Sequence, residues 1–296
     1  MLNFGFNEAK DMFANPSGKE HELIKTFCAV KCLISWHLDE TATICRERCG
    51  GGGYLAYNRI CEGIAGGHSG MTAEGDNRVL MQKIVKDVLQ HTQKQQHRMP
   101  QMTKCPVREI PGLDSVADLE TLVNLVYYRE NLEIQQMSEL LQKKLMTEGK
   151  KFYDVWMFEV SDNIQSFAQA FGERIRVESA MRVLSNCSHQ QTKEALSKAI
   201  RLHCLQLVRK NLDWYMVNGV ITKKSACLDL EDQFQRAVKD LAPFVNDFIE
   251  GFNIPKIPQI IGPIARDYVK FNTQNDMDNV DAAGNIFDFT ANRPKL

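Results

Sequence analysis

The sequence predicts an all-α protein built as a helical bundle, and three observations support this. Apolar residues recur at three- and four-residue spacing through most of the chain, which draws one apolar stripe on a helix. No proline occurs between Pro111 and Pro243, so nothing in that stretch breaks a helix. Half of the 18 glycines lie between Gly50 and Gly75. We therefore expect the glycine-dense stretch to be rich in loops and the proline-free stretch to be helical.

The first helix is predicted at residues 21–48. Gly50 is expected to end it as a left-handed C-cap, because glycine adopts that conformation without strain. The apolar residues of the helix share one face at helical spacing; they are Leu23, Ile24, Phe27, Val30, Leu33, Ile34 and Leu38.

A second helix is predicted at residues 77–92, with Asp76 or Asn77 capping its start. The segment that follows is polar, contains three prolines and has no apolar period, so we interpret residues 96–114 as a linker. Beyond it, helices that would pack as an up-and-down bundle are predicted at residues 115–146, 151–171, 173–184, 190–218 and 230–250. The domain organisation is then a helical domain at 1–95, the linker, a second helical domain at 115–252 and an extended tail at 253–296.

Composition excludes several classes of function. Lys and Arg total 36 against 37 Asp and Glu, and no basic run occurs, which argues against a nucleic-acid or anionic-membrane partner. No apolar stretch is long enough for a membrane span, and the N-terminus lacks the features of a signal peptide. The nine cysteines form no C-x-x-C pair, which favours free thiols in a reducing compartment.

Two candidate sites follow from local chemistry. The glycines at residues 50–53 either bring backbone close to a phosphate-bearing ligand or form a plain helix stop and tight turn. Glu74, between the glycines and the next helix, is either a general base whose pKa an apolar ligand raises by desolvation, or, with Asp76, a residue that serves the helix end. The residues alone leave both alternatives open.

A metal site is not expected. Cys28 and Cys32, like Cys45 and Cys49, are four residues apart and share a helix face. No histidine lies at ligand spacing near either pair, and no H-E-x-x-H pattern occurs. We interpret these cysteines as buried thiols.

Two motifs carry a resemblance to a known family. The residues CRERCGGGGY (45–54) and TAEGDNRVLMQ (72–82), eighteen residues apart, resemble the C-terminal helical region of the acyl-CoA oxidases, a branch of the acyl-CoA dehydrogenase superfamily. The family pattern is Cys-Gly-Gly-His-Gly-Tyr followed by Thr-Tyr-Glu-Gly-Asp-Asn. Ser35-Trp36 and the late PIARDYV (263–269) add to the likeness, which thus spans most of the chain.

The resemblance implies FAD-dependent α,β-desaturation of a fatty acyl-CoA, with O2 reoxidising the flavin to give H2O2. It implies Glu74 as the base that removes the α-proton. It also implies flavin contacts by Gly50 and Gly51, commonly across a dimer interface, and by Asp76 and Asn77. The expected partners are acyl-CoA, O2 and a second subunit, either a homodimer mate or a full-length oxidase.

The chain also departs from the family pattern. Gly52 stands where the family has His and Ala73 where it has an aromatic residue, and both changes would loosen the wall around Glu74. Members of the family are about twice as long, with an N-terminal helical domain and a β-domain. A non-catalytic module that pairs with a full-length oxidase is therefore the alternative function, and a dehydrogenase that hands electrons to a flavoprotein is a further rival. The tail Pro294-Lys295-Leu296 resembles the peroxisomal S-K-L signal.

Overall fold

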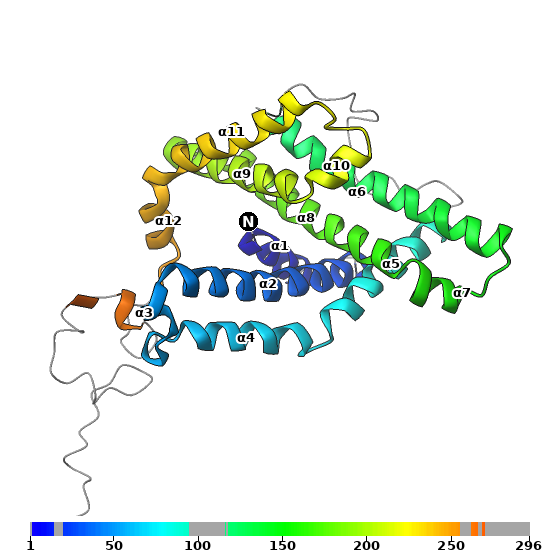
Figure 1. Cartoon of the computed structure of the whole chain (residues 1–296), viewed down its shortest axis with the longest axis horizontal. Coiled ribbons are helices and arrows are strands. Elements are labelled where there is room, and N and C mark those ends of the chain that lie inside the picture. Colours follow the sequence, from blue (N-terminus) through cyan, green and yellow to red (C-terminus); the bar gives the residue numbers. More distant parts are fainter. Residues whose placement is uncertain are drawn as a thin grey trace, which may run out of the picture. The chain divides into compact units, whose positions relative to one another are not determined.

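In a computed structural model of the chain, the structure describes residues 2–14, 20–94, 116, 118–254, 262–265 and 268–269. Every regular element within these residues is a helix, as predicted for an all-α fold (Figure 1). The predicted linker at 96–114 and the tripeptide 294–296 lie outside the described residues. The chain divides into two compact units: residues 1–33 with 77–246, and residues 34–76 with 247–296. The domain boundaries expected from the sequence stay a prediction.

The first unit is a bundle with α8 at its centre. Helix α8 packs against α1, α5, α6 and α9, and α9 also packs against α6 and α11 (Figure 1). The helices are α1 (Leu2–Ala14), the beginning of α2 (Glu20–Arg48), α5 (Asn77–Lys94), α6 (Leu119–Gln142), α7 (Phe152–Asp154), α8 (Ser161–Asn186), α9 (Gln190–Lys210), α10 (Leu212–Val217) and α11 (Lys224–Leu241). Short π- or 3-10-helical turns complete it: η2 (Lys143–Thr147), η3 (Val155–Glu159) and η4 (Ala242–Phe244).

The predicted break at residue 172 is wrong, because α8 runs unbroken from Ser161 to Asn186. Gly172 lies inside it, where a Cβ atom would come within 2.6 Å of Leu33 Cδ1 and 3.5 Å of Ala29 Cβ. The glycine therefore lets α2 approach α8 closely. The chain breaks earlier, at Val160 (φ −122°, ψ 10°), where η3 ends.

Other helix boundaries also differ from the prediction. Helix α1 was not predicted, and the expected helix at 190–218 divides at Asn211 (φ −113°, ψ 26°) into α9 and α10. The expected helix at 230–250 begins earlier, at Lys224, and its later part is η4 and α12 (Val245–Gly251). The predicted helices at 21–48, 77–92 and 115–146 correspond closely to α2, α5 and α6.

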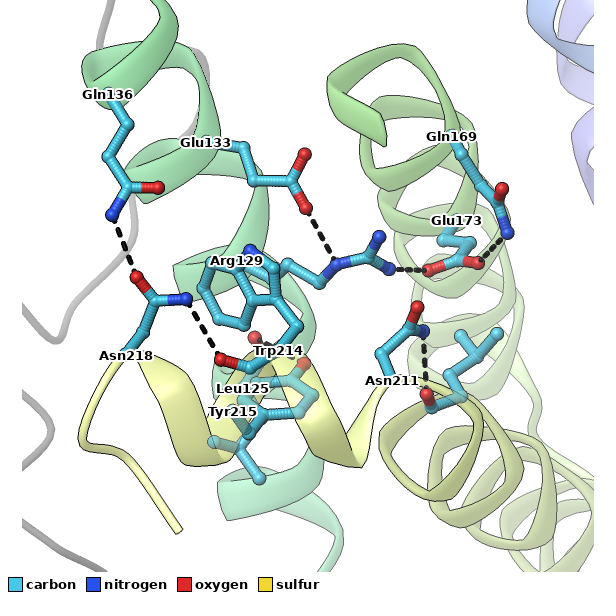
Figure 2. Close-up of polar contacts among 11 residues, drawn as sticks. Leu125, Arg129, Glu133, Gln136, Gln169, Glu173, Asn211, Trp214, Tyr215 and Asn218 are labelled. Carbon is cyan, nitrogen blue, oxygen red and sulfur yellow. Dashed lines mark hydrogen bonds and ion pairs between the residues drawn. The ribbon is translucent and has the colours of Figure 1, made fainter. Parts of the chain in front are cut away.

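Charged side chains are buried between α6 and α8. Arg129, 4% exposed, donates from Nε to Glu133 at 2.9 Å and from a terminal nitrogen to Glu173 at 2.7 Å (Figure 2). One residue further along each helix, Arg174 donates two hydrogen bonds to Glu130, at 2.8 and 3.1 Å, and Glu130 is fully buried. Burial raises the pKa of the Glu130 and Glu133 carboxyls, and the facing arginines oppose that rise. Sequence patterns did not indicate this network, since its residues resemble those of a solvated helix face.

The second unit contains the end of α2, α3 (Gly50–Tyr54), η1 (Ala56–Asn58), α4 (Ile60–Thr72), η5 (Pro263–Ala265) and most of α12. The prediction that residues 50–75 are rich in loops is wrong, since most of them are helical. The glycines instead allow α4 to pack against α2: Gly63, Gly67 and Gly70 lie against Ala42, Asp39 and Ser35. At Gly67 a Cβ atom would lie 3.0 Å from the backbone nitrogen of Asp39. Glycine serves here as a small helix-contact residue and not as a loop former.

A search of the described residues for membrane spans found none, because no helix among them is both long enough and apolar enough.

Candidate functional site

Glu74 lies in the tight turn that joins α4 to α5. Helix α4 ends at Thr72, Ala73 is extended (φ −63°, ψ 146°), and Glu74 and Gly75 have φ values of 57° and 103°. Helix α5 then begins at Asn77, as the sequence predicted. The Glu74 side chain is exposed, so its carboxylate is accessible near the start of α5.

The backbone of Glu74 is in the left-handed region, which is unfavourable for any residue with a Cβ atom. The conformation costs about 1 kcal/mol relative to glycine. Among the described residues, Arg59, Glu74 and Asn253 are the non-glycine residues with positive φ. Strained residues of this kind cluster at functional sites. An exposed glutamate gains no burial energy that would offset this strain, which makes Glu74 a candidate functional residue.

Asn77, the first residue of α5, is buried, with 2% of its surface exposed. Its Oδ1 accepts a hydrogen bond from Lys31 Nζ at 2.8 Å, and its Nδ2 donates to the Cys32 carbonyl at 3.4 Å. The carboxamide therefore anchors the start of α5 to α2. Asp76, one residue earlier, is half-buried. The role of both residues toward a flavin stays a prediction, but the contacts of Asn77 already fix the end of the turn that carries Glu74.

The four glycines at residues 50–53 have different surroundings. Gly50 has the predicted left-handed conformation (φ 57°), and a Cβ atom at Gly50 or Gly51 would meet no atom of the described residues within 4 Å. At Gly53 a Cβ atom would lie 2.3 Å from the Arg46 carbonyl oxygen, so that glycine is required by packing. The first two glycines thus leave an open, exposed backbone edge, as the cradle of a phosphate needs. This short segment therefore both ends α2 and leaves the backbone of its first two glycines exposed.

Gly50 and Glu74 lie at opposite ends of α4. This helix has 13 residues, so it spans about 20 Å at 1.5 Å per residue. Gly52 does not border Glu74: a Cβ atom at Gly52 would lie 3.0 Å from Tyr268 Oη and 3.3 Å from Ile264 Cδ1. Tail residues of the same chain occupy the space beside Gly52, and the expectation that Gly52 loosens the wall around Glu74 stays a prediction.

The cysteines are more exposed than expected. Cys32 is buried and Cys28 half-buried, but Cys45 and Cys49 are exposed, so the interpretation of both pairs as buried thiols is wrong for the second pair. No group of three or more His, Cys, Asp or Glu side chains suited to a metal was found in the part of the chain that the structure describes.

Comparison with known families accounts for the two motifs. The model of the acyl-CoA oxidase C-alpha1 domain matches residues 5–89, and the acyl-CoA oxidase model matches residues 118–256. The chain belongs to the acyl-CoA oxidase family. Glu74, Gly50, Gly51, Asp76 and Asn77 all lie within the first match, so the resemblance carried by the motifs is confirmed at the level of the family.

Curated relatives in this family are distant. An acyl-coenzyme A oxidase-like protein of Mus musculus is 23% identical over 240 residues, which cover 77% of this chain and 38% of the mouse protein. The peroxisomal acyl-coenzyme A oxidase 2 of Arabidopsis thaliana is 24% identical over 76% of this chain and 34% of its own length. The peroxisomal acyl-coenzyme A oxidase 3 of Homo sapiens is 34% identical over 114 residues. The chain therefore spans well under half the length of these relatives.

Solved acyl-CoA oxidases have the same fold. An acyl-CoA oxidase-1 of Caenorhabditis elegans, in complex with FAD and ATP, superposes with a TM-score of 0.71 at 18% identity, over 81% of this chain and 38% of that one. The acyl-CoA oxidase3 of Yarrowia lipolytica has a TM-score of 0.71 at 17% identity, over 95% of this chain and 44% of its own. These likenesses confirm the fold expected from the sequence, the all-α C-terminal region of an acyl-CoA oxidase.

Proposed function

We propose that this chain supplies the catalytic base and one flavin-binding edge of an acyl-CoA oxidase, the enzyme that desaturates fatty acyl-CoA between the α and β carbons. The observation that carries the proposal is the strained, exposed Glu74 in a motif that matches the family's Glu-Gly-Asp-Asn pattern. Membership of the family and the FAD in the solved C. elegans relative support it.

In the proposed reaction, the Glu74 carboxylate takes the α-proton of the thioester. The turn holds this carboxylate next to the start of α5. An acyl chain bound against it would exclude water from the carboxylate while it accepts the proton. The chemistry that a bound FAD would supply is acceptance of the β-hydride, with the two electrons then reducing O2 to hydrogen peroxide.

The open backbone of Gly50 and Gly51 fits the diphosphate part of FAD, because no side chain stands between it and a ligand. Since α4 separates these glycines from Glu74 by about 20 Å, we assign the two ends to two different flavins of a dimer. Each chain would then offer its base to one flavin and its glycine edge to the other. Asp76 and Asn77 are proposed as further contacts on the Glu74 side.

An apolar stripe on α2 is consistent with a missing partner surface. Its members are spaced as on one helix face and are 36–45% exposed: Ile24, Phe27, Ile34 and Leu38. A face of this kind on a helix is normally covered by protein. We propose that the rest of an oxidase, in a homodimer or in a pairing with a full-length oxidase, covers it. The peroxisome is the proposed location, on the basis of the relatives named as peroxisomal.

The test of the proposed function is Glu74→Gln in an assembly that contains the other oxidase domains. Desaturation of an acyl-CoA should fall by about 10² to 10⁴, because glutamine has the same shape and cannot accept the proton. Flavin absorbance should not change. Glu40→Gln is the matched control, as it makes the same change at an exposed glutamate of the same unit that has no proposed role, and it should retain most of the turnover. A Glu74→Gln variant that keeps more than roughly a tenth of the activity would exclude Glu74 as the base.

A further inference from the structure

Asn58 joins two parts of the second unit that are far apart in the sequence. Its Nδ2 donates a hydrogen bond to the Gly52 carbonyl at 2.7 Å, and its Oδ1 accepts one from the Ile264 backbone N–H at 2.9 Å. The residue is 4% exposed. A carboxamide suits this position because it carries a donor and an acceptor side by side. We call these two hydrogen bonds the Asn58 bridge.

Close backbone packing accompanies the bridge. A Cβ atom at Gly262 would lie 2.6 Å from the Asn58 carbonyl oxygen and 2.7 Å from its Cα, so only glycine fits there. The side chains of Tyr268 and Ile264 also lie close to Gly52, within 3.3 Å of where its Cβ atom would be. Burial raises the pKa of the nearby Tyr57 phenol, and Tyr268 raises it further. Gly262, Ile264 and Tyr268 thus contact Asn58 and Gly52 through backbone packing, one hydrogen bond and side chains.

We propose that Asn58 is a positioning residue. By its hydrogen bonds to both Ile264 and Gly52, it holds residues 50–53 in the conformation that leaves the backbone of Gly50 and Gly51 exposed. Four consecutive glycines have more conformational freedom than any other sequence, and a ligand that binds them must order them. Pinning the Gly52 carbonyl removes much of that freedom before the ligand arrives. The nature of the ligand, the diphosphate of FAD, rests on the proposed function. The bridge itself does not.

Hydrogen–deuterium exchange on the full chain tests the bridge without a ligand. Asn58→Ala should accelerate amide exchange about tenfold in two places at once, residues 52–58 and residues 264–265, since it removes one hydrogen bond to each. Asn211→Ala is the matched control, because Asn211 also donates to a backbone carbonyl, that of Leu207 at 2.8 Å, in the first unit. It should change neither region. Acceleration in only one of the two regions would overturn the bridge.

Asn58→Asp separates hydrogen bonding from packing. A protonated carboxyl offers a donor and an acceptor in the geometry of the amide, whereas an ionised carboxylate faces the Gly52 oxygen with negative charge. At pH 5 the variant should exchange more nearly like the wild type at the same pH, and at pH 8 it should resemble Asn58→Ala. A role in packing alone would give no such pH dependence, and its absence would overturn the positioning role.

FAD is the probe for the consequence at Gly50 and Gly51. In the assembly that contains the other oxidase domains, added FAD should slow exchange at residues 50–54 of the wild type, and Asn58→Ala should need about tenfold more FAD for the same protection. Asn211→Ala should need no more than the wild type. If FAD did not slow exchange in the wild type, the proposed function would be contradicted, but the Asn58 bridge would not be affected. Equal FAD requirements in the wild type and Asn58→Ala would overturn the positioning role.

Discussion

The α6–α8 interface of the first unit and the α2–α4 interface of the second hold helices together by opposite means. Between α6 and α8 lie large side chains and buried ion pairs such as Arg174–Glu130. Between α2 and α4 the helix backbones approach each other where side chains are missing, at Gly63, Gly67 and Gly70. The first interface depends on each buried charge having its partner, and the second depends on the glycines having no Cβ atom. Their sensitivity to mutation should differ accordingly.

The largest expected effect is at the charged interface. Arg174→Met should lower the free energy of unfolding by about 3–5 kcal/mol, because it leaves the fully buried Glu130 without its partner. Denaturant unfolding followed by circular dichroism measures it. Arg209→Met is the control. Like Arg174, Arg209 lies over a phenylalanine ring and pairs with a glutamate, but the side chains of Arg209 and Glu231 are each 44% exposed. Its loss should stay below about 1 kcal/mol. Equal losses would show that the Arg174 pair contributes no more than a surface pair.

The glycine interface should be sensitive to a single carbon atom. Gly66 and Gly67 are neighbours on α4, and a Cβ atom meets nothing within 4 Å at the first but lies 3.0–3.2 Å from Asp39 at the second. Both Ala substitutions gain the same helix propensity. Gly67→Ala should therefore be less stable than Gly66→Ala by about 1–3 kcal/mol, the usual effect of overpacking. Equal stabilities would mean that α2 and α4 separate at little cost.

The response to pH should identify the charge left behind in Arg174→Met. Without the arginine, only the smaller effect of the Lys25 charge opposes burial, so the pKa of Glu130 rises further in the folded state and stays ordinary in the unfolded state. The folded state then binds a proton more readily, and the stability lost in the variant should return as the pH falls. The recovery should approach about 1.4 kcal/mol per pH unit below the folded-state pKa, down to about pH 4.3. A deficit that is constant between pH 7 and pH 5 would contradict this account.

The smallest effect should be a gain. Glu74→Gly relieves the left-handed strain at φ 57° and should stabilise the chain by about 1 kcal/mol, while it removes the proposed base. Asn253→Gly, at φ 48°, is the control and should gain less, because asparagine tolerates this conformation. Thermal unfolding of the two variants measures the difference. A loss of stability in Glu74→Gly would indicate that the glutamate stabilises the turn and is not kept for function.

Much of the candidate site was readable from the sequence. The motif around Glu74 gave the turn, and the apolar period gave the start of α5 at Asn77. The left-handed Gly50 followed from the end of the apolar stripe. Asn58 was not found, because its partner Ile264 is 206 residues away in the sequence and an isolated asparagine carries no local signal.

The sequence by itself determined the helices with a clear apolar period, the end of α2, the family and the candidate base, since these depend on neighbours along the chain. The tertiary structure decided what each glycine does. Gly50 ends a helix, Gly67 and Gly172 let helices touch, and Gly53 packs on Arg46. A glycine is equally suited to a loop and to a close helix contact, and only the element packed against it selects between the two. For the same reason the sequence could not distinguish Arg129 and Arg174 from residues of a solvated helix face. Only the packing of α6 against α8 buries them.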